Sequence, residues 1–166
     1  MTQGFLSRVR FTPATTRRLM NFWPPFRGAG IRVTHIGADW REVRVELRQR
    51  LLNRNYVGVH FGGSIFSMTD PFHMLMMMHN LGRDFIVWDK AGSVRFLKPG
   101  RGTLQARFVL TQQMVDEALA AASDGARHEP TYSVEVTNGE GEVVARVEKT
   151  LHIRRANALP AQKVAA

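Results

Sequence analysis

One short stretch of the sequence concentrates side chains that could perform hydrolytic chemistry. Asn55 and His60 precede the glycine pair Gly62 and Gly63, and Asp70 follows seven residues after the second glycine. Glycine at a helix N-terminus lets a carbonyl group approach backbone N–H donors, which stabilise the oxyanion formed during attack. An acid one or two turns further along can align water as a general base, or attack directly as a nucleophile. These residue types therefore suit attack on a carbonyl group.

The same residues also have structural interpretations. Asp70-Pro71 has the form of a helix N-cap followed by proline at the first helical position, and proline inside a helix costs about 3 kcal/mol. The glycine pair could serve tight packing alone, and His60 could be a structural histidine. His73 could contact Asp70 across one helical turn, or it could lie on a plain helix surface or an interface. The sequence leaves these alternatives open.

The segment that contains the acid predicts a long helix over residues 62–81. Its residues are apolar nearly all round, so other elements must cover most of its surface. The methionine cluster within it is typical of a core, and soft methionine side chains would also suit an adaptable apolar pocket. We expect a sheet curled round this helix.

Six strands are predicted to form that sheet. Residues 41–50 alternate apolar Val43, Val45 and Leu47 with charged residues, which indicates an antiparallel strand with one solvated face. Gly92 suggests a bulge in its strand. The other predicted strands are residues 31–36, 85–97, 103–110, 131–137 and 142–153, the last two joined by a turn at residues 138–141.

Two further helices complete the predicted outline. Residues 12–23 begin with Thr12-Pro13, which resembles an N-cap plus a first helical proline, and Pro24-Pro25 should end this helix. We expect three large apolar residues to dock it on the domain, since burial of each stabilises by roughly 1.5–3 kcal/mol. They are Leu19, Phe22 and Trp23. Residues 115–122 predict a short helix with Asp116 and Glu117 in its first turn, where carboxylates suit the helix dipole.

Length and composition indicate one α+β domain. The 166 residues fit a single domain over residues 1–155, with residues 1–26 as a helical extension and residues 156–166 as a flexible tail. The chain has no cysteine, which excludes disulfides, thiolate metal sites and a cysteine nucleophile. No secretory signal or membrane span is evident, so we expect a cytoplasmic protein that does not bind membranes.

Charge is concentrated in the first part of the chain. Residues 1–60 hold eleven arginines against three acidic residues, a net charge of +8 within a formal total of +9. Such a basic part could hold anionic ligands, or its charges could lie on solvated faces. No nucleic-acid-binding motif appears, and no histidine spacing suits a metal. We therefore expect neither nucleic acid nor a metal as a partner.

The stretch from Asn55 to Asp70 resembles the Asn…His-Gly-Gly…Asp signature of hotdog acyl-CoA thioesterases of the phenylacetic-acid-pathway type. Phe61-Gly62-Gly63 with Asp70-Pro71 is similar to a group of uncharacterised bacterial proteins related to those thioesterases. In that group a stretch like residues 86–91 leads into a strand ending in a basic residue, proline and glycine, as in residues 98–100. The resemblance covers roughly residues 25–155.

This resemblance implies a hotdog fold: a six-stranded antiparallel sheet wrapped around a long central hydrophobic helix. It implies an acyl-CoA hydrolase without a cofactor, working as a homodimer or homotetramer with its active site between subunits. Gly63 would supply the oxyanion N–H, Asp70 the base, and Asn55 would orient the carbonyl or water. Gly62 and Phe61 would line the substrate site. The basic residues for the CoA phosphates would be Arg95, Lys98 and Arg101.

The chain departs from the family signature at one position. The family histidine immediately precedes the glycine pair, whereas here Phe61 holds that place and His60 lies one residue earlier. In an extended chain a shift of one residue turns a side chain to the opposite side. An alternative function is therefore a hotdog protein that binds acyl-CoA or fatty-acyl groups without catalysis.

Overall fold

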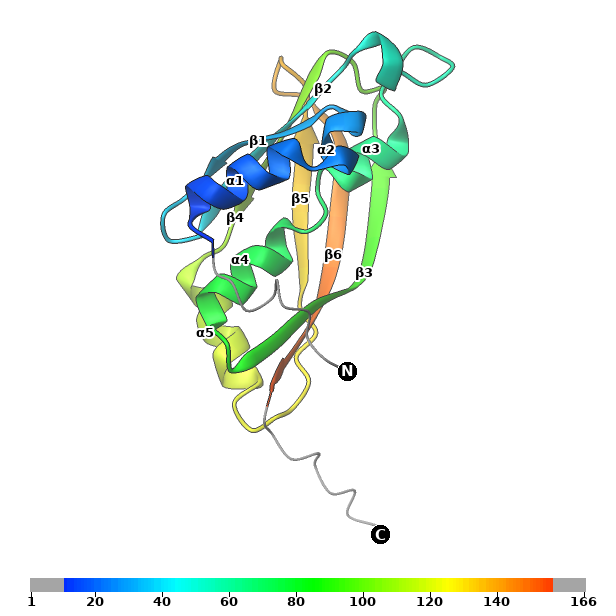
Figure 1. Cartoon of the computed structure of the whole chain (residues 1–166). Helices are drawn as coiled ribbons and strands as arrows, with labels where there is room; N and C mark the ends of the chain where they lie inside the picture. Colours follow the sequence, from blue (N-terminus) through cyan, green and yellow to red (C-terminus); the bar gives the residue numbers. More distant parts are fainter. Residues whose placement is uncertain (1–10, 157–166) are drawn as a thin grey trace.

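The computed structural model describes residues 11–156, in which six antiparallel strands form one sheet in the order β1-β2-β4-β5-β6-β3. Helices lie against one face of this curled sheet (Figure 1). The predicted α+β hotdog arrangement is therefore confirmed. The strands are β1 (Ile31–Ile36), β2 (Glu42–Arg48), β3 (Phe85–Phe96), β4 (Thr103–Val109), β5 (Thr131–Thr137) and β6 (Val143–Arg155). The helical elements are α1 (Pro13–Phe22), α2 (Pro24–Ala29), the 3₁₀ turn η2 (Leu51–Asn53), α3 (Gly62–Ser67), α4 (Phe72–Leu81) and α5 (Gln112–Ala121).

Alternation along the strands gives the sheet one apolar face. In β2, Val43, Val45 and Leu47 are buried as predicted, and the charged residues between them face outward. The register places these three opposite Phe108, Ala106 and Leu104 of β4, which are also buried. Aligned apolar rows of this kind bury the helical layer on one side of the sheet and leave the other side to solvent.

The long apolar helix is divided in two. α3 ends at Ser67 and α4 begins at Phe72, so the prediction of one continuous helix over residues 62–81 was wrong at this point. Pro71 explains the break, because proline has no N–H to continue the helical hydrogen bonds. Asp70 is not the N-cap of α4 either, since Pro71 holds that position without a side-chain bond. Asp70 therefore lies in a turn between two helices.

The N-terminal helix docks differently from the prediction. Leu19, Phe22 and Trp23 remain 51%, 72% and 50% exposed, so the expected apolar docking through them was wrong. α1 ends at Phe22, just before Pro24-Pro25, as predicted, but Pro24 also begins a second short helix, α2, whose Phe26 is buried in the core. α1 is instead joined to the sheet by Asn21.

Asn21 covers one edge of the sheet. Its amide nitrogen donates to the Val33 carbonyl at 2.9 Å, and its amide oxygen accepts from the Val33 N–H at 2.8 Å. The side chain thus takes the place of a neighbouring strand on edge strand β1. β3, the other edge strand, is twelve residues long, largely exposed, and has no described element beyond it in Figure 1. One edge of the sheet is therefore covered by a side chain, whereas the other edge is open.

Two local details also differ from the sequence-based predictions. α5 begins at Gln112 with Thr111 as its N-cap, three residues earlier than expected, so Asp116 and Glu117 lie beyond its first turn. The irregularity in β3 falls between Asp89 and Ala91, and Gly92 itself is paired in register with Lys149. Glycine at position 92 instead makes room for the Phe66 ring, because an added Cβ would lie 2.9 Å from that ring.

Asn21→Ala should lower the free energy of unfolding by about 1–3 kcal/mol, because it leaves two edge groups of β1 without their partners. Urea denaturation measures this change. The control is Leu19→Ala on the same helix, whose exposed side chain should matter by about 0.5 kcal/mol or less. Equal losses in both variants would show that α1 is attached through its apolar residues after all.

Candidate functional site

Several of the predicted site residues meet in a groove of about 560 Å³. Its lining includes residues of the loop after η2, which projects at one end of the molecule in Figure 1. The predicted site residues in its lining are Asn55, His60, Gly62, Lys98 and Arg101. The remaining lining residues are Val57, Val59, Ile65, Phe96, Leu97, Pro99 and Gly100. The groove thus combines apolar walls with two cationic side chains. Gly63, Phe61, Arg95 and Asp70 are not part of its lining.

Asn55 organises the loop that forms one wall of the groove. Its side-chain oxygen accepts hydrogen bonds from the N–H groups of Val57 at 3.2 Å and Val59 at 3.0 Å. Its side-chain nitrogen donates to the His60 carbonyl at 3.4 Å. Both ends of the amide are therefore engaged within the loop, as is typical of asparagine at a turn.

His60 fixes this loop to the connection between β3 and β4 on the opposite side of the groove. The residue is 3% exposed, and its Nε2 lies 2.8 Å from the carbonyl oxygen of Gly102, while its backbone N–H donates to Gly100. Burial lowers the pKa of His60, and the bond to Gly102 opposes this shift. His60 lines the groove, but its buried ring is held through Nε2 by a backbone carbonyl, so its part in the site is to position the loop.

The glycine pair begins α3, with Phe61 as the N-cap residue. A Cβ on Gly62 would lie 2.8 Å from the Phe96 ring, and a Cβ on Gly63 would lie 2.4 Å from the Phe61 ring. Glycine at both places therefore lets aromatic rings pack against the start of the helix. The first N–H groups of a helix have no intrahelical acceptor, so those of the glycines are directed away from the helix body.

Asp70 lies in a charged cluster that the sequence analysis did not predict. The ammonium group of Lys149 on β6 lies 2.5 Å from Oδ1 of Asp70 and 3.4 Å from Oδ1 of Asp89 on β3. Only 6% of the Lys149 side chain is exposed, compared with 50% for Asp70. Burial raises the pKa of Asp89, and the positive charge of Lys149 opposes this effect. The acid of the signature is thus half exposed and held by a buried lysine.

The sequence did contain a signal for this lysine. Buried residues alternate along β6, and Lys149 falls in the inward row between Val147 and Leu151. A charged residue in an inward row needs a partner of opposite charge. Asp70 and Asp89 could not have been identified as those partners, because they come from other elements.

His73 is buried next to this cluster. Its ring lies 5.2 Å from that of Phe108 and 5.3 Å from that of Tyr132 between centroids. Burial, with the charge of Lys149, lowers the pKa of His73 from 6.5 to about 4. The proposed surface or interface position for His73 was therefore wrong, because the neutral ring belongs to the core.

The groove and the acid lie at opposite ends of α3. Gly62 begins this six-residue helix, which is about 9 Å long, and Asp70 lies three residues beyond its last residue, Ser67. Arg95 on β3 is exposed and lies outside the groove lining. The described chain alone therefore does not bring Asp70 and the groove residues around one reacting group.

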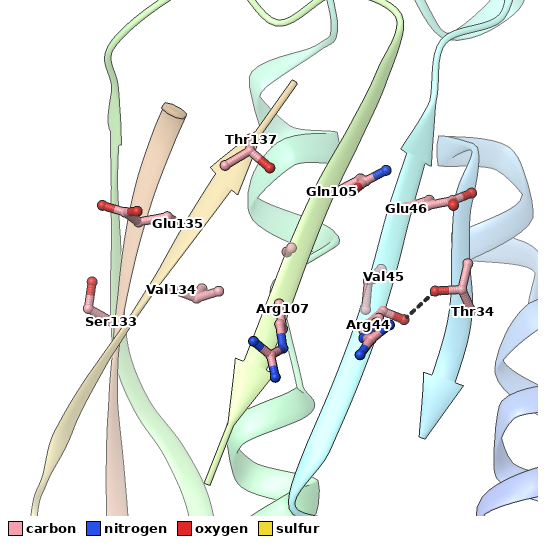
Figure 2. A pocket seen from close by; sticks show the side chains of 11 residues that line it. Thr34, Arg44, Val45, Glu46, Gln105, Arg107, Ser133, Val134, Glu135 and Thr137 are labelled. Atoms are coloured by element: carbon pink, nitrogen blue, oxygen red, sulfur yellow. Dashed lines mark hydrogen bonds between the residues drawn. The ribbon is translucent and has the colours of Figure 1, made fainter. Parts of the chain in front are cut away.

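A second hollow, of about 660 Å³, lies on the outer face of the sheet (Figure 2). It opens where β4 and β5 pair over only two positions, Gln105 with Thr137 and Ala106 with Val136. Arg44 and Arg107 at its rim both pair with Glu42. None of the predicted site residues lies there. Its opposite charges neutralise each other, as expected for a solvated sheet face.

The described residues contain neither a metal-binding cluster nor a membrane-spanning helix. Within residues 11–156, no group of three histidine or acidic side chains is arranged to hold a metal ion. None of the helices in this part of the chain is long and apolar enough to cross a membrane.

Comparison with known proteins identifies relatives mainly by structure. The model of the domain family of unknown function DUF4442 matches residues 12–153. No curated protein sequence matches the chain. A Pseudomonas aeruginosa protein, PA5026, described as of unknown function and a probable thioesterase, has a similar structure with a TM-score of 0.78 at 19% identity. The match covers 89% of this chain and 98% of that one.

Two further solved structures share the fold. The thioesterase HI1161 from Haemophilus influenzae matches with a TM-score of 0.63 at 14% identity, over 89% of this chain and 94% of its own. The PaaI protein from the phenylacetic acid degradation operon of E. coli matches with a TM-score of 0.59 at 18% identity, over 87% and 93%. These likenesses establish the hotdog fold of the chain.

The buried histidine should make stability depend on pH. Between pH 6.5 and about 4 the unfolded chain protonates His73 while the folded chain does not, so acidification favours unfolding by up to roughly 3 kcal/mol. His73→Met should remove this part of the loss between pH 7 and 4, as measured by urea denaturation at each pH. His35→Gln, on the exposed side of β1, is the control. A His73→Met variant with the wild-type pH dependence would contradict the assignment.

Proposed function

The chain belongs to the DUF4442 domain family, and from its hotdog fold and the composition of its groove we propose that it hydrolyses acyl-CoA or a related thioester. The observation that carries this proposal is the meeting of Gly62, Lys98 and Arg101 in one groove with apolar walls. Ligand sites typically combine mostly apolar walls with a few polar groups that fix orientation. A CoA thioester offers a matching apolar acyl chain and anionic phosphates.

The cations of the groove suit phosphate groups. Lys98 is 52% exposed and pairs with Glu142 at 2.6 Å, an exposed ion pair that contributes little to stability. Arg101 donates to the Gly58 carbonyl at 3.3 Å, which leaves other guanidinium donors for an anion. Both side chains can therefore turn to a phosphate at small cost.

We propose that a second copy of the chain completes the active site. The open edge of β3 presents unpaired backbone groups, which favour pairing with another strand. Antiparallel pairing of two β3 strands runs the Phe96 end of one copy beside the Phe85 end of the other. The acid cluster lies beside the middle of β3, at Asp89 and Gly92, so this pairing places the acid cluster of each copy beside the partner's strand and supports a homodimer as the smallest active unit.

Within this proposal each signature residue has one task. The Gly63 N–H at the start of α3 stabilises the oxyanion that forms from the thioester carbonyl. Asp70 activates the attacking water. Asn55 and His60 act by fixing the loop that shapes the groove, since their hydrogen bonds lie within it.

A specific observation favours the alternative function, in which the protein binds acyl-CoA without catalysis. Asp70 is paired with Lys149, and both ends of the Asn55 amide are used by its own loop. Asn55 is then not free to orient a thioester, and one of the two carboxylate oxygens of Asp70 is already engaged. Both functions predict CoA binding, but only the hydrolase function predicts turnover. An experiment must therefore measure both binding and turnover.

Asp70→Asn should lower turnover of acyl-CoA by about 10²- to 10⁴-fold, because it removes the base and keeps the size of the side chain. CoA affinity and the dimer should be retained. Thioesterase assays across acyl lengths measure turnover, and Asp84→Asn, an exposed aspartate before β3, is the control. Full activity in Asp70→Asn would exclude the catalytic role. Tight CoA binding without wild-type turnover would establish the binding function.

Charge reversal should locate the phosphate site. Lys98→Glu and Arg101→Glu should each weaken CoA binding at least tenfold and make it less sensitive to salt, because they remove charge-assisted phosphate contacts. Arg44→Glu, on the outer face of the sheet, is the matched control and should change affinity less than twofold. Arg95→Glu shows whether the site extends along β3. Equal effects at all positions, measured by calorimetry, would contradict a defined site.

A further inference from the structure

Lys149 occupies a position that the fold otherwise reserves for apolar side chains. It stands in the inward row of β6 with Val147, Leu151 and Ile153, each fully buried. A buried ammonium group loses its hydration, and a buried ion pair is often no more stabilising than an apolar residue of similar size. Stability alone therefore does not account for a lysine here.

The surroundings of Lys149 hold its side chain in one direction. Gly92 is its register partner on β3, and a Cβ there would lie 3.1 Å from Cδ of the lysine. On the other side Tyr132 of β5 is its register partner. The ring of Phe66 on α3 lies 5.2 Å from the ammonium nitrogen, as in a cation–π contact. The missing side chain at Gly92 thus forms a slot through which the lysine reaches the turn between α3 and α4.

The ammonium group lies close to two carboxylates, Asp70 in this turn and Asp89 on β3, at different distances. Oδ1 of Asp70 is at hydrogen-bonding distance, 2.5 Å, whereas Oδ1 of Asp89 is an ion-pair neighbour at 3.4 Å. Half of the Asp70 side chain is exposed, although the lysine that holds it is buried. One oxygen of the carboxylate is therefore fixed from inside the protein, and the exposed part of the side chain faces outward.

We propose that Lys149 is a positioning residue for the reaction: it fixes Asp70 through Oδ1, so that the other carboxylate oxygen is presented to the attacking water. This inference rests on the proposed hydrolase function and adds to it a residue outside the Asn…Gly-Gly…Asp signature. Asp89 balances the buried ammonium from the β3 side. Pre-orientation of a catalytic group by a buried partner is a general source of rate.

The test compares turnover in single and double variants of the full-length protein. Lys149→Met, which keeps most of the apolar stem and removes the ammonium group, should lower kcat at least tenfold and change KM less than twofold. Because the lysine acts through Asp70, the Lys149→Met/Asp70→Asn double variant should be no slower than Asp70→Asn alone. Arg146→Met, which removes an exposed cation from the same strand, is the matched control and should keep wild-type kcat.

A chemical rescue separates positioning from a purely structural role. The chain has no cysteine, so Lys149→Cys introduces a unique thiol. Alkylation of the unfolded variant with 2-bromoethylamine, in which the thiolate displaces bromide, rebuilds a lysine-like ammonium group. After refolding, kcat should recover to within about fivefold of wild type taken through the same steps, whereas alkylation with iodoacetamide should restore nothing.

The outcomes distinguish the two proposals. Wild-type kcat in Lys149→Met together with an inactive Asp70→Asn would overturn the positioning role and leave the hydrolase function intact. A double variant slower than Asp70→Asn by the full factor of Lys149→Met would also overturn it, since the lysine would then act independently. Full activity in Asp70→Asn, or a wild type without turnover, would overturn the hydrolase function and the positioning role with it.

Discussion

Burial of the apolar segment between Gly62 and Leu81 is the constraint on which the rest of the structure depends. Phe72, Met76 and Met77 are fully buried against the inward rows of the sheet. A flat sheet would leave parts of such a segment in water, so the strands curl round it. The outer face of the same strands then carries paired charges such as Glu42 with Arg107. One apolar segment thus defines the inside and outside of every strand.

The break in this segment at Pro71 creates the turn that holds Asp70. Pro71 prevents helical continuation, and the resulting turn places Asp70 where a buried lysine can reach it. A continuous helix would have presented an acid on its surface with no fixed partner. The break at a proline and the space at Gly92 therefore act together, although one lies in the helical layer and the other in the sheet.

The groove and the acid of the proposed active site lie near opposite ends of α3. The groove near Gly62 has the walls and cations suited to an acyl-CoA, and the turn at Asp70 has the fixed carboxylate. β1 is covered by Asn21, so β3 is the edge available for a second copy. Under the proposed function, this open edge is where the second copy pairs.

The sequence by itself determined the strands and the approximate positions of most helices, because these depend on local patterns. Alternation fixed the inward rows of β2 and β4, Thr12 marked a helix start, and the glycine pair with Asp70 marked the chemical segment. Only the tertiary structure decided the partners. Lys149 meets Asp70 across 79 residues, and His60 reaches Gly102 across 42. Such contacts depend on how the sheet curls, and no local pattern encodes that geometry.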